Sequence, residues 1–496
     1  MTMEQVSRRN AMSLSAAGLL AATAGEVKAA AAEGQPSHSS SPTVVMDPRQ
    51  ALIEAAKVNS PQLAGMIDSV LPQQKALGGA IAFLRDKPPS VNGSMPGAAA
   101  WGPFPTQDST VVWGQDFLFV MLSDQPASLV IDGRPEQPMQ RAPGSNYWYR
   151  LERNLRLGTT HRYTFLSGGK NVGTNDVAAY TPLSYPIAGA PSGTLSEART
   201  VTSRIYGGAQ AKYWLYVNAG VDTARGAPIM VWQDGPRHIG ASDANGTRLK
   251  TVTDNLVYLK RIPPMVHLLI APGTGGETRP LRYKDEPQDN VMRSLQYDSV
   301  SGRYGDYILQ EVLPEVHRSI KLREDGYSRG AGGLSSGGIC SFSLAWFHPD
   351  RFSRVHSTIG TFTGMQWYPE QNIDGGYILS NRVRRDEKRN IRVWMSDGMN
   401  DIEVGPDGRA DLYVAGSWPL NNLQMANALK TRGYDFHFRF GTAGHSEAQE
   451  AMDLPEALSW LWRDYDPEKT AQTFEQEEAE RRKPIFRVQV ANRDAW

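Results

Sequence analysis

The sequence predicts an α/β protein, with a doubly wound, mostly parallel sheet preceded by a smaller all-β unit. At 496 residues the chain is too long for one ordinary domain, so more than one folded unit is expected. Between residues 106 and 190, short apolar runs alternate with turn residues, which is typical of an antiparallel β-sandwich. Between residues 200 and 465, apolar strands alternate with helical patterns, which is typical of a sheet covered by helices on both faces.

The first residues predict an export signal. In residues 1–32, Arg8 and Arg9 precede a weakly apolar run and a small-residue cleavage site. Adjacent arginines resemble a twin-arginine signal, so we expect export to the periplasm or the medium. The apolar run is too short to span a bilayer, so no membrane anchor is expected. Residues 33–46 have the composition of a linker, and residues 47–105 contain short amphipathic helical patterns.

The individual elements follow from the spacing of apolar residues and turn signals. In the sandwich, the expected strands are Thr110–Trp113, Phe117–Leu122, Ala127–Ile131, Tyr147–Leu151 and His161–Leu166. In the larger unit, the expected strands are Ala211–Val217, Pro228–Trp232, Met265–Ile270, Ile391–Met395 and Tyr434–Phe440. The expected helices are Leu249–Lys260, Tyr304–Ile320 with a kink at Pro314, Ile339–Phe347, Asn421–Arg432 and Leu454–Trp462. Residues 466–496 are expected to form a charged tail.

A short glycine-rich pattern provides the candidate nucleophile. Residues 333–337 read Gly-Leu-Ser-Ser-Gly, the G-x-S-x-G pattern in which a serine sits on a sharp turn between a strand and a helix. The alternative is an ordinary Gly/Ser-rich turn. Ser335 is the predicted nucleophile, and the helix behind it would place its N-terminus beneath an oxyanion. Gly330, Gly332 and Gly333 precede the serine, so the pairing of that strand is weakly specified by its sequence.

A nucleophilic serine needs a base and an acid that orients the base. His445 follows a predicted strand through a glycine loop, which places it at the carboxyl end of the sheet, and it is the predicted base. The acid should follow the preceding strand, where Asp397 and Asp401 both qualify. We prefer Asp401, because it lies further into the loop and Asp397 would suit a turn role. The order Ser, Asp, His along the chain is that of α/β-hydrolases.

Two backbone N–H groups are needed to stabilise a tetrahedral oxyanion. Ser336, directly after the nucleophile, is predicted to provide one of them. The second is expected in the loop after the strand that ends at Trp232. Pro236 has no N–H, which leaves Gly235 or Arg237, and Gly235 is our choice.

Five stretches together resemble the enterochelin esterase-like family, the esterase D and feruloyl esterase group of α/β-hydrolases. They are Met230–Gly235, Arg293–Asp298, Gly333–Gly338, Asp397–Asp401 and Gly441–His445. The resemblance covers residues 110 to about 465 and implies an α/β-hydrolase fold preceded by an immunoglobulin-like (E-set) domain. It also implies a triad of the elbow serine, the Asp of a Gly-x-Asn-Asp loop and a His after a glycine loop.

These observations together indicate a serine carboxylic-ester hydrolase that works through an acyl-enzyme. The resemblance implies carbohydrate-linked feruloyl-type esters or siderophore-type esters as substrates. The alternatives are an acyltransferase on the same scaffold and a non-catalytic protein that binds a glycan or another partner. Three aromatic residues in loops are expected either to contact substrate or to pack between domains, namely Trp367, Tyr368 and Trp418.

The composition and motifs of the chain restrict the classes of partner and cofactor that are expected. Lys plus Arg and Asp plus Glu both number 52, so the chain has no basic excess for binding nucleic acid. Neither a His/Cys cluster with metal-ligand spacing nor a nucleotide-binding fingerprint is evident, so no metal and no cofactor are expected. The only cysteine, Cys340, cannot form an internal disulfide.

Overall fold

The computed structural model describes residues 109–113, 116–141, 147–152, 155–156, 158–184, 187, 189–222, 224–240, 246–277, 288–368, 374–402, 416–483 and 489–490. The predicted export signal (1–32), linker (33–46) and helical segment (47–105) lie outside these residues.

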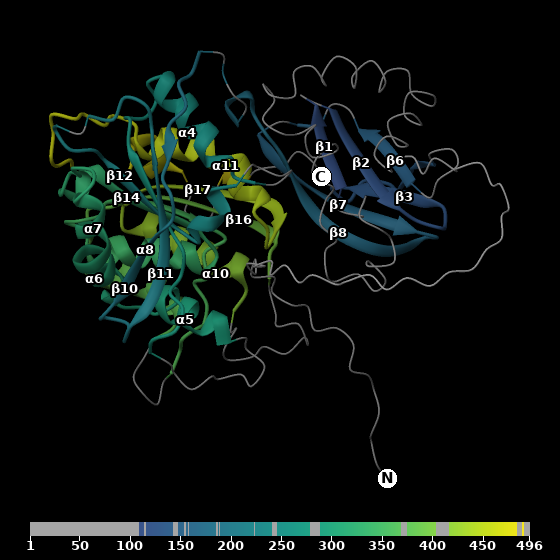
Figure 1. Ribbon diagram of the computed structural model, residues 1–496. Helices are drawn as coiled ribbons and strands as arrows, with labels where there is room; N and C mark the ends of the chain where they lie inside the picture. Colours follow the sequence, from purple (N-terminus) through teal and green to yellow (C-terminus); the bar gives the residue numbers. More distant parts are fainter. Residues whose placement is uncertain are drawn as a thin grey trace, which may run out of the picture.

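A mixed sheet forms the larger unit, and it has the strand order of an α/β-hydrolase-like fold (Figure 1). The order is β10-β11-β13-β12-β14-β15-β16-β17-β18, and β9 pairs with β11. Pairing is antiparallel among β9, β10, β11 and β13, and parallel from β13 onward. The strands are β9 (Thr194–Leu195), β10 (Arg199–Ser203), β11 (Ala209–Val217), β12 (Ile229–Gln233), β13 (Val266–Ile270), β14 (Arg329–Leu334), β15 (Arg354–Thr358), β16 (Arg392–Asn400), β17 (Asp435–Gly444) and β18 (Gln489–Val490).

Helices cover both faces of this sheet. On one face α4 and α11 pack against Met230 and Trp232, and on the other α5 to α8 and α10 pack against Val231 and its neighbours. This alternation follows from the pleat, which points successive side chains of β12 to opposite faces. The α-helices are α4 (Leu249–Tyr258), α5 (Gln288–Tyr297), α6 (Arg303–Tyr307), α7 (Leu313–His317), α8 (Ser336–Phe347), α9 (Leu379–Arg385), α10 (Trp418–Thr431), α11 (Ala448–Leu461) and α12 (Glu478–Arg482). Shorter helical turns are η3 (Pro182–Ser184), η4 (Gly235–His238), η5 (Ile308–Val312), η6 (Gly326–Ser328) and η8 (Gly376–Ile378).

The helix expected over Tyr304–Ile320 is interrupted, as Pro314 led us to expect. It consists of α6, the π-helical turn η5 and α7, and Pro314 is the second residue of α7. Proline lacks the N–H that would continue the ladder of the preceding turn. A wider π turn therefore stands just before the proline, and the three helical pieces follow one another without a loop between them.

Strand β14 lies in the middle of the sheet, between β12 and β15, although its sequence is rich in glycine. A Cβ atom on Gly332 would lie 2.5 Å from Cζ3 of Trp232, and one on Gly330 would collide with Sδ of Met230. The large side chains of β12 thus occupy the space that side chains of β14 would need. Glycine is required here by packing against the neighbouring strand.

The smaller unit consists of two four-stranded antiparallel sheets, β1-β2-β6-β5 and β4-β3-β7-β8. They enclose an apolar core that includes Phe119, Tyr163 and Phe165, whose rings meet edge to face. The strands are β1 (Ser109–Trp113), β2 (Asp116–Leu122), β3 (Ala127–Ile131), β4 (Gln137–Pro138), β5 (Gln140–Arg141), β6 (Tyr147–Glu152), β7 (Thr159–Ser167) and β8 (Lys170–Ala179). All five strands expected from the sequence are present, and β8, the longest, was not among them.

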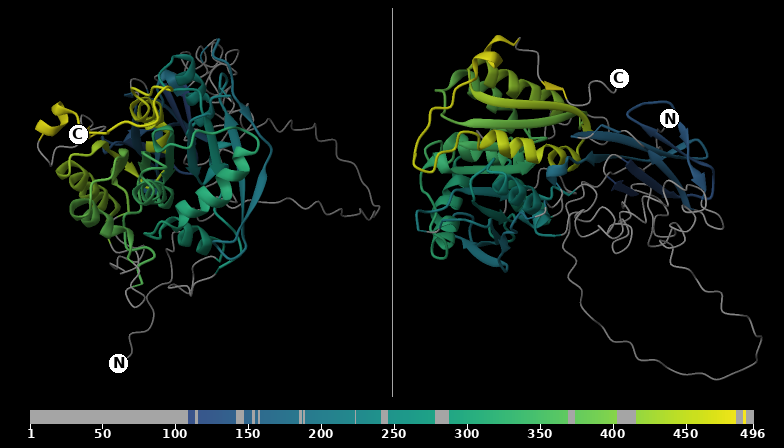
Figure 2. Two further views of the ribbon diagram at one scale, coloured as in Figure 1. Left: turned by 90° about the vertical axis from the view of Figure 1, so that its left-hand side faces the viewer. Right: turned by 90° about the horizontal axis from the view of Figure 1, so that it is seen from above.

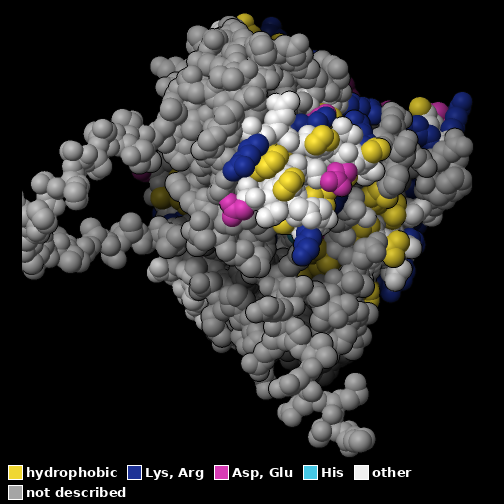
Figure 3. Space-filling model, turned by 90° about the vertical axis from the view of Figure 1, so that its right-hand side faces the viewer, with side chains coloured by type: hydrophobic (Ala, Val, Ile, Leu, Met, Phe, Trp, Pro, Cys, Tyr) yellow, Lys and Arg dark blue, Asp and Glu magenta, His cyan; other side chains and the backbone are white. Residues whose placement is uncertain are grey.

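The two units are in direct contact, with β7 and β8 lying against β17 and α11 (Figures 1 and 2). A small apolar cluster joins them, made of Ala178, Tyr180, Ala448, Ala451 and Met452. The Tyr180 hydroxyl also donates a hydrogen bond to the Gly246 carbonyl at 2.5 Å. On the side of the molecule shown in Figure 3, basic, acidic and apolar side chains are interspersed over the surface of the described residues.

Candidate active site

Ser335 occupies the sharp turn between β14 and α8, and its backbone is strained. Its φ of 59° and ψ of −120° lie in a region that side chains other than glycine rarely adopt. Four backbone hydrogen bonds hold it there: its N–H donates to the Thr358 carbonyl at 2.9 Å, and its carbonyl accepts from the N–H groups of Gly338 at 2.9 Å, Thr361 at 3.1 Å and Ile339 at 3.3 Å. A Cβ on Gly333 would lie 2.6 Å from the Gly337 carbonyl carbon, so the turn needs glycine at its start.

His445 reaches Ser335 from the end of β17. That strand continues through the glycine loop to Gly444, which places His445 directly after its carboxyl end. The Nε2 atom of His445 lies 2.8 Å from Ser335 Oγ, and its Nδ1 atom lies 2.6 Å from Asp401 Oδ1. The structure therefore brings Ser335, His445 and Asp401 together in one hydrogen-bonded chain, in the order a base-activated nucleophile requires.

The two candidate acids have different environments. Asp401 accepts from His445 and from the N–H of Ile402 at 2.6 Å. Asp397 lies within β16, where its Oδ1 accepts from the N–H of Gly398 at 2.7 Å. Burial, followed by the adjacent carboxylate of Asp401 and a hydrogen bond between the two side chains, raises the pKa of Asp397 well above its usual range. Ionisation of Asp397 is thus disfavoured, whereas the hydrogen bond to the imidazole is made by Asp401.

The two expected oxyanion donors lie on adjacent segments. Ser336 is the first residue of α8, and Gly235 is the first residue of η4 after β12. Among the described residues, neither N–H is assigned a hydrogen-bond acceptor, whereas the Arg237 N–H donates to the Asp234 carbonyl at 3.2 Å. A Cβ on Gly235 would collide with the backbone of Leu269, so only glycine fits that position. Gly235 therefore has the available N–H, and the N–H of Arg237 is already used.

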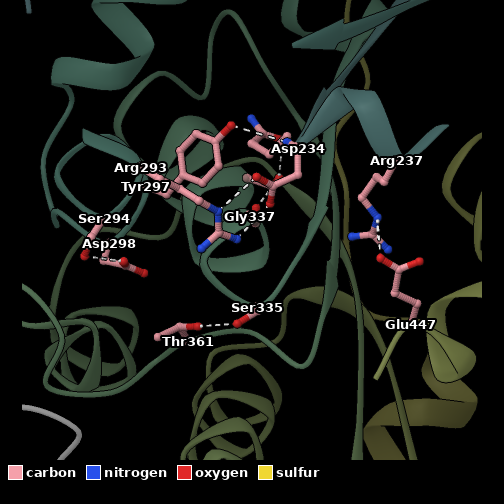
Figure 4. A network of polar contacts seen from close by, with 12 residues as sticks. Asp234, Arg237, Arg293, Ser294, Tyr297, Asp298, Ser335, Gly337, Thr361 and Glu447 are labelled. Atoms are coloured by element: carbon pink, nitrogen blue, oxygen red, sulfur yellow. Dashed lines mark hydrogen bonds and ion pairs between the residues drawn. The ribbon is translucent and has the colours of Figure 1, made fainter. Parts of the chain in front are cut away.

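Asp234 fixes the loop that carries Gly235, and α5 fixes Asp234. Its backbone is left-handed, with φ 53°, and its carboxylate accepts two hydrogen bonds from Arg293, at 2.9 and 2.8 Å. The Asp234 N–H donates to the Tyr297 hydroxyl at 3.3 Å. Figure 4 shows Arg293 and Tyr297 converging on Asp234, with Ser335 and Thr361 facing each other nearby. A bidentate guanidinium–carboxylate pair of this kind is geometrically specific, so it holds the loop in one position.

The three aromatic residues singled out from the sequence occupy different settings. Trp418 is only 3% exposed; its indole N–H donates to Thr361 Oγ1 at 3.3 Å, and its ring meets the His445 ring edge to face at 5.5 Å. Tyr368 is buried, at 7% exposed. Trp367 is partly exposed and packs edge to face against Tyr377 at 5.9 Å. The Trp418 ring thus packs against the imidazole of His445. Substrate contact by Trp367, Tyr368 and Trp418 stays a prediction.

Within the described part of the chain, no group of three or more His, Cys, Asp or Glu side chains is placed to hold a metal ion. No helix in the same residues combines the length and the apolar composition needed to cross a bilayer. Cys340 is buried in α8 as a free thiol, and burial raises its pKa well above the usual range.

The family of this chain follows from its similarity to one group of known proteins. The family described as putative esterase matches residues 213–461, half of the chain, and this stretch contains every residue of the hydrogen-bonded chain above. The chain belongs to the putative esterase family. This confirms the resemblance to esterase-like α/β-hydrolases that the sequence motifs suggested.

Individual relatives of this esterase-family chain are distant. The iron(III) enterobactin esterase of Dickeya dadantii (strain 3937) is 24% identical over 274 residues, 52% of this chain and 53% of that protein. The chain thus spans about half the length of the curated relative it matches. A solved enterobactin esterase from Shigella flexneri, in the presence of enterobactin, has a TM-score of 0.48 at 16% identity and covers 70% of this chain and 93% of its own. A ferulic acid esterase from Anaeromyces mucronatus has a TM-score of 0.41 at 13% identity, with 58% and 96% covered.

Some residues of the esterase site were not found from the sequence. Thr361 contacts Ser335 Oγ at 3.1 Å, but it lies in a loop with no recognisable pattern. Arg293 and Tyr297 stand in one of the motifs that carried the family resemblance, yet nothing in their spacing indicated that they hold Asp234. Their role depends on α5 lying beside the start of η4, which is a tertiary contact. Their i, i+4 spacing predicts that both side chains lie on one face of a helix, but it does not indicate which residue they contact.

Proposed function

We propose that this chain is a serine esterase that hydrolyses carboxylic esters through an acyl-enzyme on Ser335. The observation that carries the proposal is the continuous chain from Asp401 through His445 to Ser335, with contacts of 2.6 and 2.8 Å. It is joined by a strained serine backbone and by two N–H groups, of Ser336 and Gly235, on adjacent segments. Membership of the putative esterase family supports the same reaction class.

The reaction runs in two halves. His445 Nε2 takes the proton of Ser335 as Oγ attacks the ester carbonyl, and Asp401 stabilises the imidazolium that forms. The Ser336 and Gly235 N–H groups stabilise the negative oxygen of the tetrahedral intermediate. His445 then gives the proton to the leaving alcohol, which leaves an acyl group on Ser335. Water, deprotonated by His445, attacks this acyl group and releases the acid together with free Ser335.

The variant Ser335→Ala tests this proposal with p-nitrophenyl acetate as the substrate. Because the nucleophile is lost, kcat should fall by about 10⁴-fold or more. Ser343→Ala is the control: it lies on α8, the helix that follows Ser335, it is buried, and its Oγ has no hydrogen-bond partner in the described residues. Turnover that persists in Ser335→Ala would refute the proposal. Added glycerol distinguishes hydrolysis from acyl transfer, because transfer would yield the glyceryl ester.

For the substrate, we propose an ester of an aromatic acid, of the siderophore or feruloyl-carbohydrate type. Support comes from the family motifs, from a relative named as an iron(III) enterobactin esterase, and from Trp367, which lies in the same loop as Thr361. We expect kcat/KM to be higher for catecholate or feruloyl-sugar esters than for simple acetates. We also expect Trp367→Ala to reduce kcat/KM for the aromatic esters selectively. Equal kcat/KM for all esters would contradict this choice.

Two further features are proposed from the sequence. We propose that the chain is exported by the twin-arginine route, because Arg8 and Arg9 stand before an apolar run. Replacing both arginines by lysine should retain the protein in the cytoplasmic fraction, and unchanged export would exclude this route. We also propose that the two antiparallel sheets of residues 109–179 form an immunoglobulin-like E-set domain, as the family resemblance implies.

A further inference from the structure

A carboxylate from the sandwich reaches the loop that carries His445. Asp176 lies in β8, and its Oδ2 accepts a hydrogen bond from the Gly444 N–H at 2.8 Å and another from Ser446 Oγ at 2.8 Å. These two donors belong to the residues immediately before and after His445. The Oδ2 atom of Asp176 thus binds the residues on both sides of His445, the candidate base.

The Asp176 side chain is buried, with 2% of its surface exposed. Burial raises its pKa, while the Arg162 guanidinium and the hydrogen bonds from Gly444 and Ser446 act in the opposite direction. Arg162, from the neighbouring strand β7, donates to Oδ1 at 3.1 Å. Without this carboxylate, the Gly444 N–H would be left in a buried site without its acceptor, which is energetically unfavourable. The contact is therefore a strong constraint on the geometry of the loop.

The loop itself is shaped to receive this contact. A Cβ on Gly444 would lie 2.6 Å from Arg162 Nη1, so glycine lets the sandwich approach the backbone closely. The Ser446 N–H donates to the Gly444 carbonyl at 2.9 Å, which turns the chain tightly around His445. Asp401 holds the imidazole from its Nδ1 side. Backbone and ring are thus fixed by acceptors from two different units.

We infer that Asp176 is a positioning residue for His445, so that the sandwich completes the catalytic geometry of the larger unit. This inference rests on the proposed function, in which His445 is the base. Asp176 touches neither Ser335 nor the reacting atoms; it acts by fixing the backbone on both sides of the imidazole. A misplacement of about 1 Å at a catalytic group can reduce the rate about 100-fold, so a backbone clamp of this kind affects turnover directly.

The test compares Asp176→Ala with Asp132→Ala in the full chain. Asp132 is a matched control, because it is an equally buried sandwich carboxylate that accepts from His161 at 2.7 Å and from the Arg162 N–H at 2.9 Å. With p-nitrophenyl acetate, Asp176→Ala should lower kcat by about 10- to 100-fold with little change in KM. Asp132→Ala should destabilise the protein by a similar amount and leave kcat within about twofold of wild type.

Two milder variants guard against misfolding. Ser446→Ala removes one of the two donors and should lower kcat only a few-fold. Asp176→Asn keeps an oxygen acceptor for Gly444 and should recover part of the kcat lost in Asp176→Ala. A purely structural role would lower the melting temperature in both variants without this order in kcat. The inference is overturned if kcat is unchanged in Asp176→Ala, or if Asp132→Ala loses as much kcat.

A crystal structure of Asp176→Ala separates this inference from the proposed function. We expect residues 441–446 to shift and the contact between His445 Nε2 and Ser335 Oγ to lengthen beyond the 2.8 Å of the wild-type chain. A loop that superimposes on the wild-type loop would overturn the inference, whatever the activity. If instead the wild type cleaves no ester, the proposed function fails, and the loop shift still decides whether Asp176 positions His445.

Discussion

At the scale of single residues, two carboxyl groups four positions apart have different environments. Asp401 is bonded to the imidazole, whereas Asp397 is buried one step behind it and has a pKa raised well above its usual range. A carboxylate close to another is harder to ionise than one that stands alone, so the neighbouring Asp401 adds to the effect of burial on the pKa of Asp397. The hydrogen bond to the imidazole is made by Asp401.

This arrangement predicts opposite results for two conservative variants. Asp401→Asn should lower kcat by about 10⁴-fold, because an amide can hold the imidazole in the wrong tautomer. Asp397→Asn should keep kcat within about tenfold of wild type, since an amide resembles a protonated carboxyl in shape and can still accept from Gly398. Steady-state kinetics of both variants measure the difference. The assignment is wrong if Asp397→Asn is the more damaging change.

At the scale of elements, β14 and β15 form the middle of the sheet without the usual apolar sequence. In β14 the glycines make room for Met230 and Trp232. In β15 the buried guanidinium of Arg354 is surrounded by aromatic rings, with its centre 4.6 Å from the Trp462 ring and 4.7 Å from the Tyr327 ring. Burial lowers the pKa of Arg354 to about 9, and the facing rings stabilise its charged form. Both strands support the elbow directly, because β14 leads into Ser335 and Thr358 of β15 accepts its N–H.

A methyl group on Gly332 tests the packing of β14. The new Cβ would lie 2.5 Å from the Trp232 ring, in a site closed by neighbouring strands. We expect Gly332→Ala to lower the free energy of unfolding by about 1 to 3 kcal/mol, measured by urea denaturation. Gly240→Ala is the matched control, because a Cβ there meets nothing within 4 Å. Equal stability of the two variants would show that β14 tolerates side chains.

At the scale of the whole molecule, a buried ion pair joins α11 to η4, the helical turn that begins at Gly235. Glu450 of α11 accepts from Arg237 of η4, and the His356 ring lies 3.9 Å from the same carboxylate. Burial raises the pKa of Glu450 to about 7, with Arg237 opposing the rise, and burial lowers the pKa of His356 to about 3. The same helix contacts the sandwich through Ala448, Ala451 and Met452. Helix α11 therefore contacts the smaller unit, the sheet and η4.

The raised pKa of Glu450 predicts how stability depends on pH. Between its ordinary value of 4.5 and its folded value of about 7, the folded chain binds a proton that the unfolded chain does not. The contribution of this group is thus complete below pH 4.5 and is lost as the pH rises through 7, at about 1.4 kcal/mol per pH unit.

The variant Glu450→Gln, which does not titrate, should reveal this term in urea unfolding. The free energy of unfolding of wild type minus that of the variant should fall by about 2 kcal/mol between about pH 5 and pH 7. Glu456→Gln, on the same helix, reports the effect of removing a half-exposed carboxylate that is paired with Arg439. A difference that stays constant or grows with pH would contradict the assignment.

The sequence by itself predicted the α/β class, the elbow at Ser335 and His445 as its partner, and it favoured Asp401 over Asp397 as the acid. These rest on local rules: hydrophobic periodicity, the need for small residues in a sharp turn, and the ends of strands as the place for functional loops. It also predicted most strands, but missed β4, β5, β8, β9, β10, β15 and β18. Four of these are only two residues long, and in β15 the polar residues are buried by tertiary partners.

The tertiary structure alone decided which groups support that site. Arg293 reaches Asp234, and Asp176 reaches the His445 loop across 268 residues of sequence. The tertiary structure also explains the glycines of β14, since only the position of Trp232 shows why side chains are excluded there. Such contacts join segments far apart in the chain, and no local pattern encodes them, because the complementarity of a buried charge and its donors exists only after the units have packed.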